Sequence, residues 1–222
     1  MTSSSIKRRA VRDDQKLERR QELINQAWAL FQMQPYELIN IIDVARSAKL
    51  AKGTVYLYFK TKEELFLAVL IDHFAAWFDI VDAALPECPA TNEAVVNVIA
   101  SALNANPALV RLFAITHVIL ERNIDIEVAR GFKQFLLERV TRTGALLADK
   151  LVFLEPEQGG ALLMQMYALV IGVQHVADPA PIVREVLDTD PALTVFKVDF
   201  DREFRYLLTA LLHGLATQNR SG

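Results

Sequence analysis

The sequence predicts an all-α protein, with an N-terminal three-helix domain followed by a larger helical C-terminal domain. Apolar residues recur three or four positions apart along most of the chain, which is the spacing of one helix face. Few stretches alternate apolar and polar residues, and the 222 residues include only 8 glycines, so no sheet is expected. Prolines stand where the periodic segments end, and Pro107 and Pro156 are well placed as first helical residues.

The charge pattern predicts two domains. Residues 1–65 contain 12 Lys and Arg against 8 Asp and Glu, whereas residues 66–222 contain 12 against 19. The two balances, +4 and −7, add up to the formal net charge of −3. A basic N-terminal part on an acidic chain is typical of a nucleic-acid-binding domain joined to a different module. We therefore expect domain boundaries at residues 1–65 and 66–222.

Residues 39–65 contain two short amphipathic patterns followed at once by a third, which is the outline of a helix-turn-helix. The first helix is expected to begin after Asn40, a good N-cap, with Asp43 placed to accept a hydrogen bond from the Asn40 amide. Lys49 lies in the turn, where it must either adopt a left-handed backbone conformation or alter the turn. Thr61 is expected to cap the third helix.

The second short helix, over residues 51–59, carries a small and basic outer face. Its spacing turns Val55 and Phe59 inward and leaves the other side chains for solvent or nucleic acid. Lysines and tyrosine hydroxyls bind phosphates, and a glycine lets the backbone approach DNA closely. The candidate DNA-binding residues are Asn40, Lys52, Gly53, Thr54, Tyr56, Tyr58 and Lys62. Taken singly, most of them would also fit a plain three-helix corner.

The segment KGTVYLYFKTKEEL, residues 52–65, resembles the N-terminal DNA-binding domain of the TetR family of transcriptional regulators, and the resemblance covers roughly residues 14–70. It implies that residues 51–59 form the recognition helix. It further implies phosphate contact by Asn40, approach to bases and backbone by Lys52, Gly53 and Thr54, and phosphate anchoring by Tyr56, Tyr58 and Lys62. The chain departs from the usual family pattern at Lys49 (usually glycine), Ala51 (serine or threonine) and Asn40 (threonine). These departures concern local geometry, because none removes a groove-facing group.

The first twelve residues are polar and carry Lys7, Arg8, Arg9 and Arg12. We expect this segment to be unstructured in isolation. It has two interpretations, an arm that enters an adjacent minor groove and a solvated tail, and the sequence favours neither.

Beyond the DNA-binding segment the chain reads as successive helices. The helix that begins at Thr61 continues to Val81 and is expected to end at Pro86 and Pro89. Later helical patterns lie near residues 92–104, 107–121, 125–152, 156–177 and 199–217. Residues 177–199 form a longer connection with at most one short helix.

Two C-terminal segments, Ala161–Val173 and Phe204–Leu215, are more apolar than one buried face requires. A helix that is apolar on two faces needs two partners. The resemblance implies that the last two long helices form a four-helix bundle with those of a second subunit, and the alternative is a helix buried at the centre of a monomer. The candidate dimer-interface residues are Met164, Leu169, Gly172, Leu207, Leu211 and Gly214.

The middle helices carry the candidate effector site. Phe113, His117 and Glu121 fall four apart and can point from one helix face into the domain interior. The candidate effector-binding residues are Phe113, His117, Glu121, Phe132, Met164, Tyr167 and His175. A mostly apolar cavity with a few polar groups is the usual form of a small-molecule pocket, although ordinary core packing also explains each residue. His117 and Glu121 have a metal-ligand spacing, but no third ligand is identifiable, so neither a metal nor another cofactor is expected.

Other function classes are disfavoured. The sequence has no nucleophile elbow, phosphate-binding glycine loop or cysteine cluster, so we do not expect an enzyme. Cys88 is the one cysteine, no signal-peptide pattern is present, and the longest strongly apolar stretch is too short to span a bilayer. These features predict a cytoplasmic protein without a membrane partner.

Together, the motif, the charge pattern and the resemblance predict a ligand-responsive, sequence-specific DNA-binding regulator. In particular, we expect a homodimeric repressor that a small molecule of unknown identity releases from an inverted-repeat DNA operator. The alternative is a helical apolar-ligand-binding protein with weak or lost DNA binding. That alternative predicts neutral or acidic residues where Lys52, Tyr56 and Lys62 stand.

Overall fold

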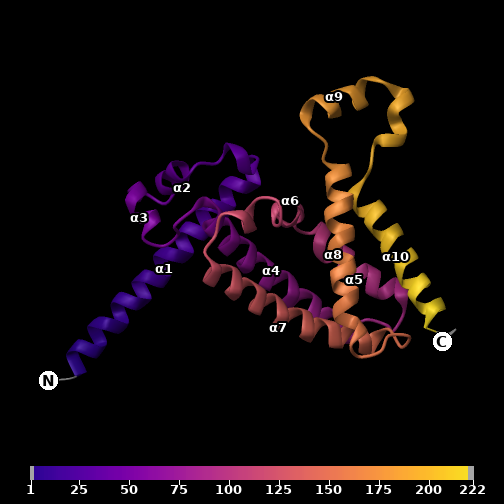
Figure 1. Cartoon of the computed structure of the whole chain (residues 1–222), viewed down its shortest axis with the longest axis horizontal. Coiled ribbons are helices and arrows are strands. Elements are labelled where there is room, and N and C mark those ends of the chain that lie inside the picture. Colours follow the sequence, from indigo (N-terminus) through magenta and orange to yellow (C-terminus); the bar gives the residue numbers. More distant parts are fainter. Residues whose placement is uncertain (1–2, 220–222) are drawn as a thin grey trace. The chain divides into compact units, whose positions relative to one another are not determined.

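The computed structural model describes residues 3–219, with side chains for residues 14–219. Within this range the chain is helical and contains no strand (Figure 1), which confirms the predicted all-α class. The long helices are α1 (Ser3–Met33), α4 (Lys62–Glu87), α5 (Asn92–Asn104), α7 (Ile126–Lys150), α8 (Gln158–Ala177) and α10 (Phe200–Gln218). The short ones are η1 (Tyr36–Leu38), α2 (Ile41–Ser47), α3 (Lys52–Tyr56), α6 (Pro107–Ile115), η2 (Leu120–Arg122), α9 (Pro181–Thr189) and η3 (Pro191–Phe196).

The chain forms two compact units whose boundary lies inside α4, between Asp72 and His73. Unit 1 contains the chain up to Asp72 together with His117–Ala129, and unit 2 contains His73–Thr116 and the chain from Arg130 onward. The expected boundary at residue 65 is therefore displaced. The physical reason is that α4 continues without a break, and its residues from 64 to 70 are all buried.

The N-terminal segment, which is expected to be unstructured in isolation, forms the start of α1 in the full chain. The backbone of residues 3–12 is already helical, because Lys, Arg and Ala are good helix formers and no Pro or Gly interrupts them. The side chains of Lys7, Arg8, Arg9 and Arg12 lie outside those described, as do residues 1–2. Whether this segment reaches a minor groove therefore stays an open prediction.

Unit 1 has a small apolar core centred on Phe66, which is fully buried. The Phe66 ring makes edge contacts with Phe31, at 5.9 Å between ring centroids, and with Tyr36, at 5.0 Å. Phe31 comes from α1, Tyr36 from η1 and Phe66 from α4. These contacts join the three elements that frame the helix-turn-helix.

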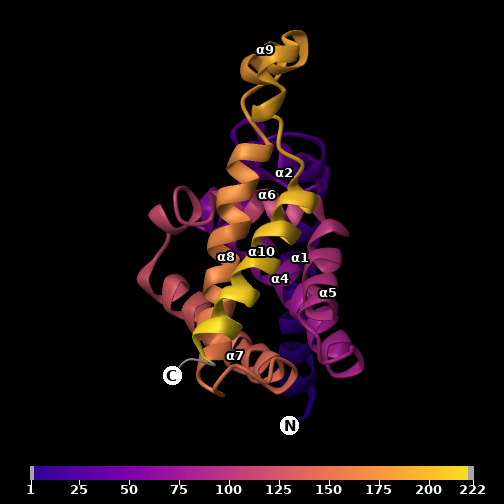
Figure 2. The same ribbon diagram turned by 90° about the vertical axis from the view of Figure 1, so that its right-hand side faces the viewer.

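In unit 2, α8 packs against α6 and α10, and α10 also packs against α5. Figure 2 shows α8 and α10 side by side along their lengths. The expected helices are present, but α6 ends at Ile115 and α4 includes Pro86 in its last turn. A proline so close to a helix end interferes little with the remaining backbone hydrogen bonds.

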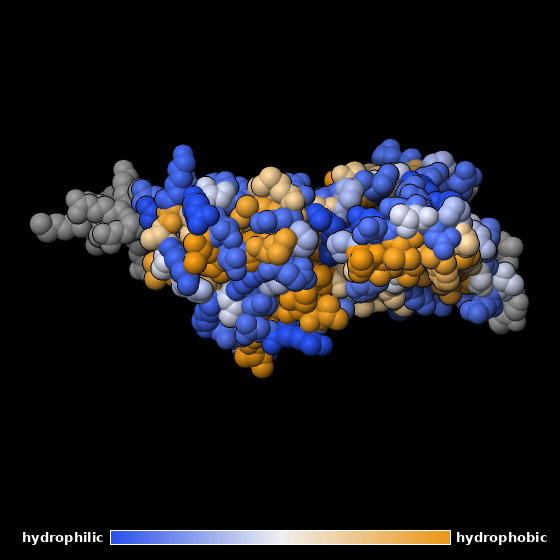
Figure 3. Space-filling view, turned by 90° about the horizontal axis from the view of Figure 1, so that it is seen from above, coloured by the Kyte–Doolittle hydropathy of each residue, from blue (hydrophilic) through white to orange (hydrophobic). Residues whose placement is uncertain are grey.

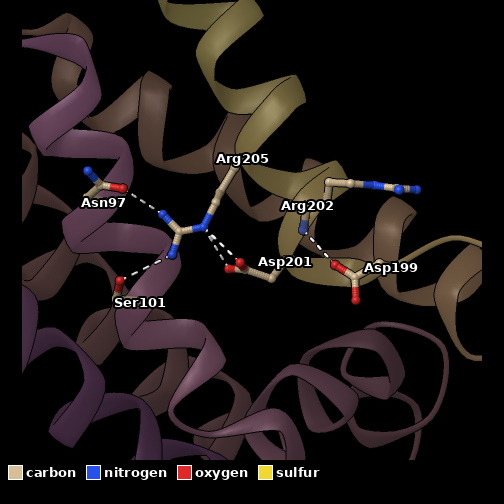
Figure 4. Close-up of polar contacts among 6 residues, drawn as sticks. All are labelled: Asn97, Ser101, Asp199, Asp201, Arg202 and Arg205. Carbon is tan, nitrogen blue, oxygen red and sulfur yellow. Dashed lines mark hydrogen bonds and ion pairs between the residues drawn. The ribbon is translucent and has the colours of Figure 1, made fainter.

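Arg205 attaches α10 to α5. Its guanidinium binds the Asp201 carboxylate with Nε at 2.9 Å from both oxygens, and it donates to Asn97 at 2.7 Å and to Ser101 at 3.2 Å (Figure 4). Asp199 caps the same helix by accepting a hydrogen bond at 2.9 Å from the backbone amide three residues later. The Arg205 guanidinium thus bonds to residues of both helices, so it holds α10 and α5 together.

The glycines of unit 2 fall into two groups. A Cβ on Gly159 would collide with the carbonyl group of Gly144, which shows that α7 and α8 touch through their backbones. A Cβ on Gly172 or Gly214 would meet no atom within 4 Å. The first group is required for packing inside the subunit, whereas the second faces open space.

By length and composition alone, α8 is apolar enough to cross a membrane, and so are α5 and the stretch Pro107–Arg122 if that bent pair is counted as one span. These helices are weak evidence for a membrane-spanning segment, because core helices of soluble proteins have the same length and apolar composition.

Candidate nucleic-acid interface

The segment from α2 to α3 forms a helix-turn-helix whose local geometry follows the sequence. Asp43 accepts a hydrogen bond from the Asn40 amide at 3.1 Å, as expected for the start of α2. Lys49 adopts the left-handed conformation with φ 55°, and the other described non-glycine residues have negative φ. The turn then closes through a 2.8 Å hydrogen bond from the Leu50 amide to the Ala45 carbonyl. The turn geometry is thus kept at the cost of strain at Lys49.

The recognition helix is shorter than predicted. The regular helix α3 covers Lys52–Tyr56, and residues 57–59 continue it as a turn, in which the Phe59 amide donates to the Val55 carbonyl at 3.0 Å. Ala51 provides no side-chain cap, as its methyl group dictates. Val55 and Phe59 are buried, which confirms their predicted inward orientation.

The outer face of α3 is free within unit 1. Lys52 and Gly53 are exposed, Thr54 and Tyr58 are partly exposed, and Tyr56 is 44% exposed. The Lys52 ammonium lies 5.8 Å from the centre of the Tyr56 ring, and a Cβ on Gly53 would meet nothing within 4 Å. A cation, a phenol and a bare stretch of backbone therefore share one surface, which suits contact with DNA phosphates and base edges.

Sequence reasoning missed Leu57, which is 77% exposed next to this face. A large apolar side chain so exposed on a three-helix unit is suited to contact a thymine methyl group or a sugar. Its spacing of four from Gly53 and three from Thr54 already places Leu57 on the outer face of a helix, but its apolar side chain carries none of the polar groups that marked the other candidates.

The first turn of α4 is held by internal hydrogen bonds. Thr61 Oγ1 accepts from the Glu64 amide at 3.0 Å, which confirms the predicted cap. The Glu64 carboxylate accepts from the Lys60 amide at 2.7 Å, one residue earlier than a standard capping box. Glu64 is buried, so this carboxylate belongs to the frame of unit 1.

Lys62 is placed differently from a freely exposed phosphate anchor. Its ammonium donates to the Tyr36 carbonyl and lies 3.6 Å from the centre of the Tyr36 ring. The side chain is half-buried, and this burial lowers the pKa of Lys62, while Glu63 and Glu37 partly oppose the effect. In this conformation Lys62 connects α4 to η1, and contact with a phosphate requires it to leave Tyr36.

A segment distant in sequence completes the start of α4. Lys60 pairs with Asp125, whose hydrogen bond and negative charge raise the pKa of the lysine. Thr61 Oγ1 donates to the Asn123 carbonyl at 2.8 Å, and Asn123 Nδ2 donates to Glu63 at 3.0 Å. Nothing local in the sequence marks these contacts, because the partners are about 60 residues apart.

Three of the candidate effector residues lie in the interior of unit 2. Phe113 and Phe132 are buried, and Tyr167 is partly buried. The Phe113 ring lies 4.6 Å from the ring of Phe74 and 5.9 Å from that of Tyr167, measured between centroids. The structure thus brings aromatic rings of α4, α6 and α8 together.

The other four candidate effector residues do not join this cluster. α6 ends at Ile115, where the Thr116 amide donates to the Phe113 carbonyl three residues back, so the expected helical face stops before His117. His117 and Glu121 instead belong to unit 1, where His117 Nδ1 lies 2.9 Å from the Glu121 carboxylate. Met164 and His175 are exposed on α8. The expectation that His117 and Glu121 point with Phe113 into the interior of one domain is therefore wrong, whereas the exposure of Met164 agrees with its other expected place, at the dimer interface. The described residues contain no group of three metal-ligating side chains.

Comparison with known families identifies both parts of the chain. Residues 23–69 match the family model described as bacterial regulatory proteins, tetR family, and residues 72–219 match the model described as tetracyclin repressor-like, C-terminal domain. The HTH-type transcriptional regulator HbdR of Aromatoleum sp. (strain CIB) is 37% identical over 70 residues. This match spans 31% of the present chain and 31% of that relative.

Solved structures extend the likeness over most of the chain. The TetR family repressor AlkX of Dietzia sp. strain DQ12-45-1b superposes with a TM-score of 0.53 at 15% identity, covering 91% of this chain and 95% of AlkX. FadR of Bacillus subtilis, solved with stearoyl-CoA, gives a TM-score of 0.51 at 16% identity, covering 86% of this chain and 97% of FadR. At these identities the likeness concerns the fold alone.

Proposed function

This chain belongs to the TetR family of transcriptional regulators, and from that premise we propose that it is a homodimeric repressor controlled by a small molecule. The observation that carries the proposal is the free outer face of α3, where exposed Lys52, Gly53 and Tyr56 stand in front of the buried Val55. This arrangement fits the insertion of α3 into a major groove.

We assign DNA contacts to the predicted set, with distinct roles. Lys52, Gly53 and Thr54 approach the bases and the adjoining backbone, while Asn40, Tyr56 and Tyr58 bind phosphates. Lys62 joins them only when its ammonium exchanges the Tyr36 carbonyl for a phosphate. Positioning contacts of this kind add affinity for any DNA, whereas base contacts give sequence preference.

The proposed dimer face consists of the outer rows of α8 and α10. On α8 the exposed row includes Ala161, Met164, Ala168, Gly172 and Val176, and on α10 it includes Tyr206, Ala210 and Gly214. Leu169, Leu207 and Leu211 are partly exposed beside these rows. The α8 sequence contains no Asp, Glu, Lys or Arg, and such a surface suits an apolar interface. A two-fold dimer presents two copies of α3 to an inverted repeat.

The proposed effector is an apolar molecule that packs among the aromatic residues of unit 2. Phe74 is the centre of that cluster, with rings of Phe78, Phe113 and Phe135 within 6.4 Å of its own. Phe74 lies on α4, the same helix whose first turn frames unit 1. Effector binding would act on DNA through α4, with a coupling of about 1–3 kcal/mol that must be reciprocal. If saturating operator DNA leaves the affinity of the protein for the effector unchanged, this mechanism is contradicted.

Selection of binding sites from a random duplex pool tests the function directly. We expect enrichment of an inverted repeat, since two α3 helices related by two-fold symmetry read two half-sites. The Lys52→Ala variant should lose most of this sequence preference. Lys133→Ala is the matched control, because Lys133 is an exposed lysine of α7 in unit 2. A folded dimer that enriches no sequence would instead favour the apolar-ligand carrier.

A further inference from the structure

Residues 178–199, which we call the arm, connect α8 to α10 and contain α9 and η3. Neither α9 nor η3 has a buried residue. Several large apolar side chains of the arm are exposed, up to 79% for Val195 and 61% for Phe196. Ile182, Val183 and Val186 on α9 are exposed as well. Figures 1 and 2 both show the arm standing beyond the ends of α8 and α10.

The arm is nevertheless internally ordered. α9 packs against η3, and ion pairs join Arg184 to Asp178 at 2.5 Å and Lys197 to Asp188 at 3.0 Å. Asp190 caps η3 by accepting from the backbone two residues later at 2.9 Å. Polar groups thus fix the shape of the arm, while its apolar side chains remain in water.

Figure 3 looks down on the arm, which lies at the top of Figure 1, and shows an elongated hydrophobic strip over it. A contiguous apolar surface of this kind usually marks a binding site. Removing it from water on association would contribute favourable binding free energy.

The charge of the arm favours one kind of partner. Residues 178–199 contain five acidic and two basic residues, and both basic residues are engaged in the internal ion pairs. An acidic segment opposes binding to nucleic acid or to an anionic bilayer. The exposed apolar side chains of the arm instead require an apolar protein surface as their partner.

This chain carries such a surface directly beside the arm. The exposed row of α8 runs up to Val176, just before the arm begins, and the exposed row of α10 starts near Tyr206, just after it ends. The arm therefore connects the two exposed rows in sequence and lies at one end of the face that we assign to the dimer. Gly172 and Gly214 face open space and leave room for close approach, but without side chains they offer little apolar area.

We propose that the arm of each subunit packs against a second copy of this chain and extends the α8–α10 interface. This inference rests on the proposed homodimer. A stable interface buries about 800 Å² per partner, and the apolar side chains of the arm supply the large groups that the glycine- and alanine-containing rows lack. Two-fold symmetry makes each arm contact occur twice per dimer.

The dimer dissociation constant, measured by sedimentation equilibrium of the full chain, tests the proposal. The double variant Val195→Asp/Phe196→Asp should raise this constant at least about a hundredfold, because each substitution acts twice. Ala192→Asp is the matched control, since it adds a charge at an exposed small residue of the same helix η3. The control should change the constant by no more than about twofold.

Two further measurements distinguish loss of the arm contact from unfolding of the variant. Circular dichroism should show an unchanged helical fold in the double variant, because no residue of α9 or η3 is buried. Amide hydrogen exchange in residues 182–196 should slow as the protein concentration rises through the dissociation constant. A wild-type chain that stays monomeric would refute the homodimer itself. A stable wild-type dimer whose constant is the same in the double variant would refute only the role of the arm.

Discussion

Two neighbouring segments of unit 1, α3 and the first turn of α4, meet their surroundings in opposite ways. On α3 the side chains of Lys52 and Tyr56 are exposed, and nothing stands within 4 Å of a Cβ placed on Gly53. At the start of α4, Lys62 is bound to Tyr36 and Glu64 is buried. A DNA-binding motif therefore combines a free reading surface with an internally bonded frame, although both look equally polar in sequence.

Gly53→Ala tests the reading surface and should have the largest effect on function. The free subunit has room for the methyl group, so the free energy of unfolding should rise by about 0.5–1 kcal/mol as a helical glycine is replaced. Affinity for the selected operator should fall at least about tenfold, because the methyl group would block close approach of the backbone to DNA. Urea unfolding and fluorescence anisotropy measure the two changes separately. Unchanged operator affinity would show that the α3 backbone stays clear of DNA.

Glu64→Ala tests the frame. This change removes a buried carboxylate that accepts from the Lys60 amide, and it should lower the free energy of unfolding by about 2 kcal/mol. Glu64→Gln keeps an acceptor oxygen, so its free energy of unfolding should fall by less than that of Glu64→Ala. At a temperature where both variants are folded, operator affinity should stay near the wild-type value. A large affinity loss in a fully folded Glu64→Ala protein would mean that frame and reading surface are not separable.

The sequence predicted the frame of the helix-turn-helix better than its functional groups. The caps at Asn40 and Thr61 and the inward positions of Val55 and Phe59 depend on residues at most a few positions apart, so local rules were sufficient. The role of Lys62 was not foreseen, because its partner Tyr36 lies in another element.

Unit 2 shows the same limit. Helix positions followed from apolar spacing, and the rings of Phe113 and Tyr167, both named as candidates for one site, lie 5.9 Å apart between centroids. His117 was misplaced, because the expected helix continued past Ile115 in the pattern but not in the structure. On a helix that is apolar nearly all round, such as α8, apolar spacing does not show which face is buried and which is exposed. Met164, which is exposed on α8, is an example.

Thr61→Ala tests the N-cap of α4, and its expected effect on stability is smaller than that of Glu64→Ala. Loss of the hydroxyl that accepts from the Glu64 amide should cost about 1 kcal/mol, the usual value for an N-cap. For a chain of 222 residues this corresponds to a fall in Tm of about 2–4 °C. Thr61→Ser retains the hydroxyl and should keep most of the stability. Equal losses in the two variants would show that the methyl group, not the cap, stabilises α4.

The smallest effect is the pH dependence contributed by Lys62. Burial lowers its pKa in the folded state below the ordinary value of 10.5, so on raising the pH the folded protein loses this proton before the unfolded chain does. Between the two pKa values the unfolded state binds more protons, and the free energy of unfolding must rise with pH in that window. The contribution is complete above pH 10.5 and disappears as the pH falls through the folded pKa.

Lys62→Met removes this titration while keeping an apolar side chain over Tyr36. Denaturant unfolding of both proteins should therefore show the wild type gaining stability relative to Lys62→Met as the pH rises from 8 towards 10. Measurement below the ordinary tyrosine pKa of 10.0 avoids the opposite contribution of Tyr36, whose own pKa is raised by burial and by its hydrogen bond to Glu63. A stability difference that is constant across this range would mean that the Lys62 ammonium is solvated in the free protein. It would then be available to phosphate without first leaving Tyr36, and the distinction between α3 and the start of α4 would be lost at this residue.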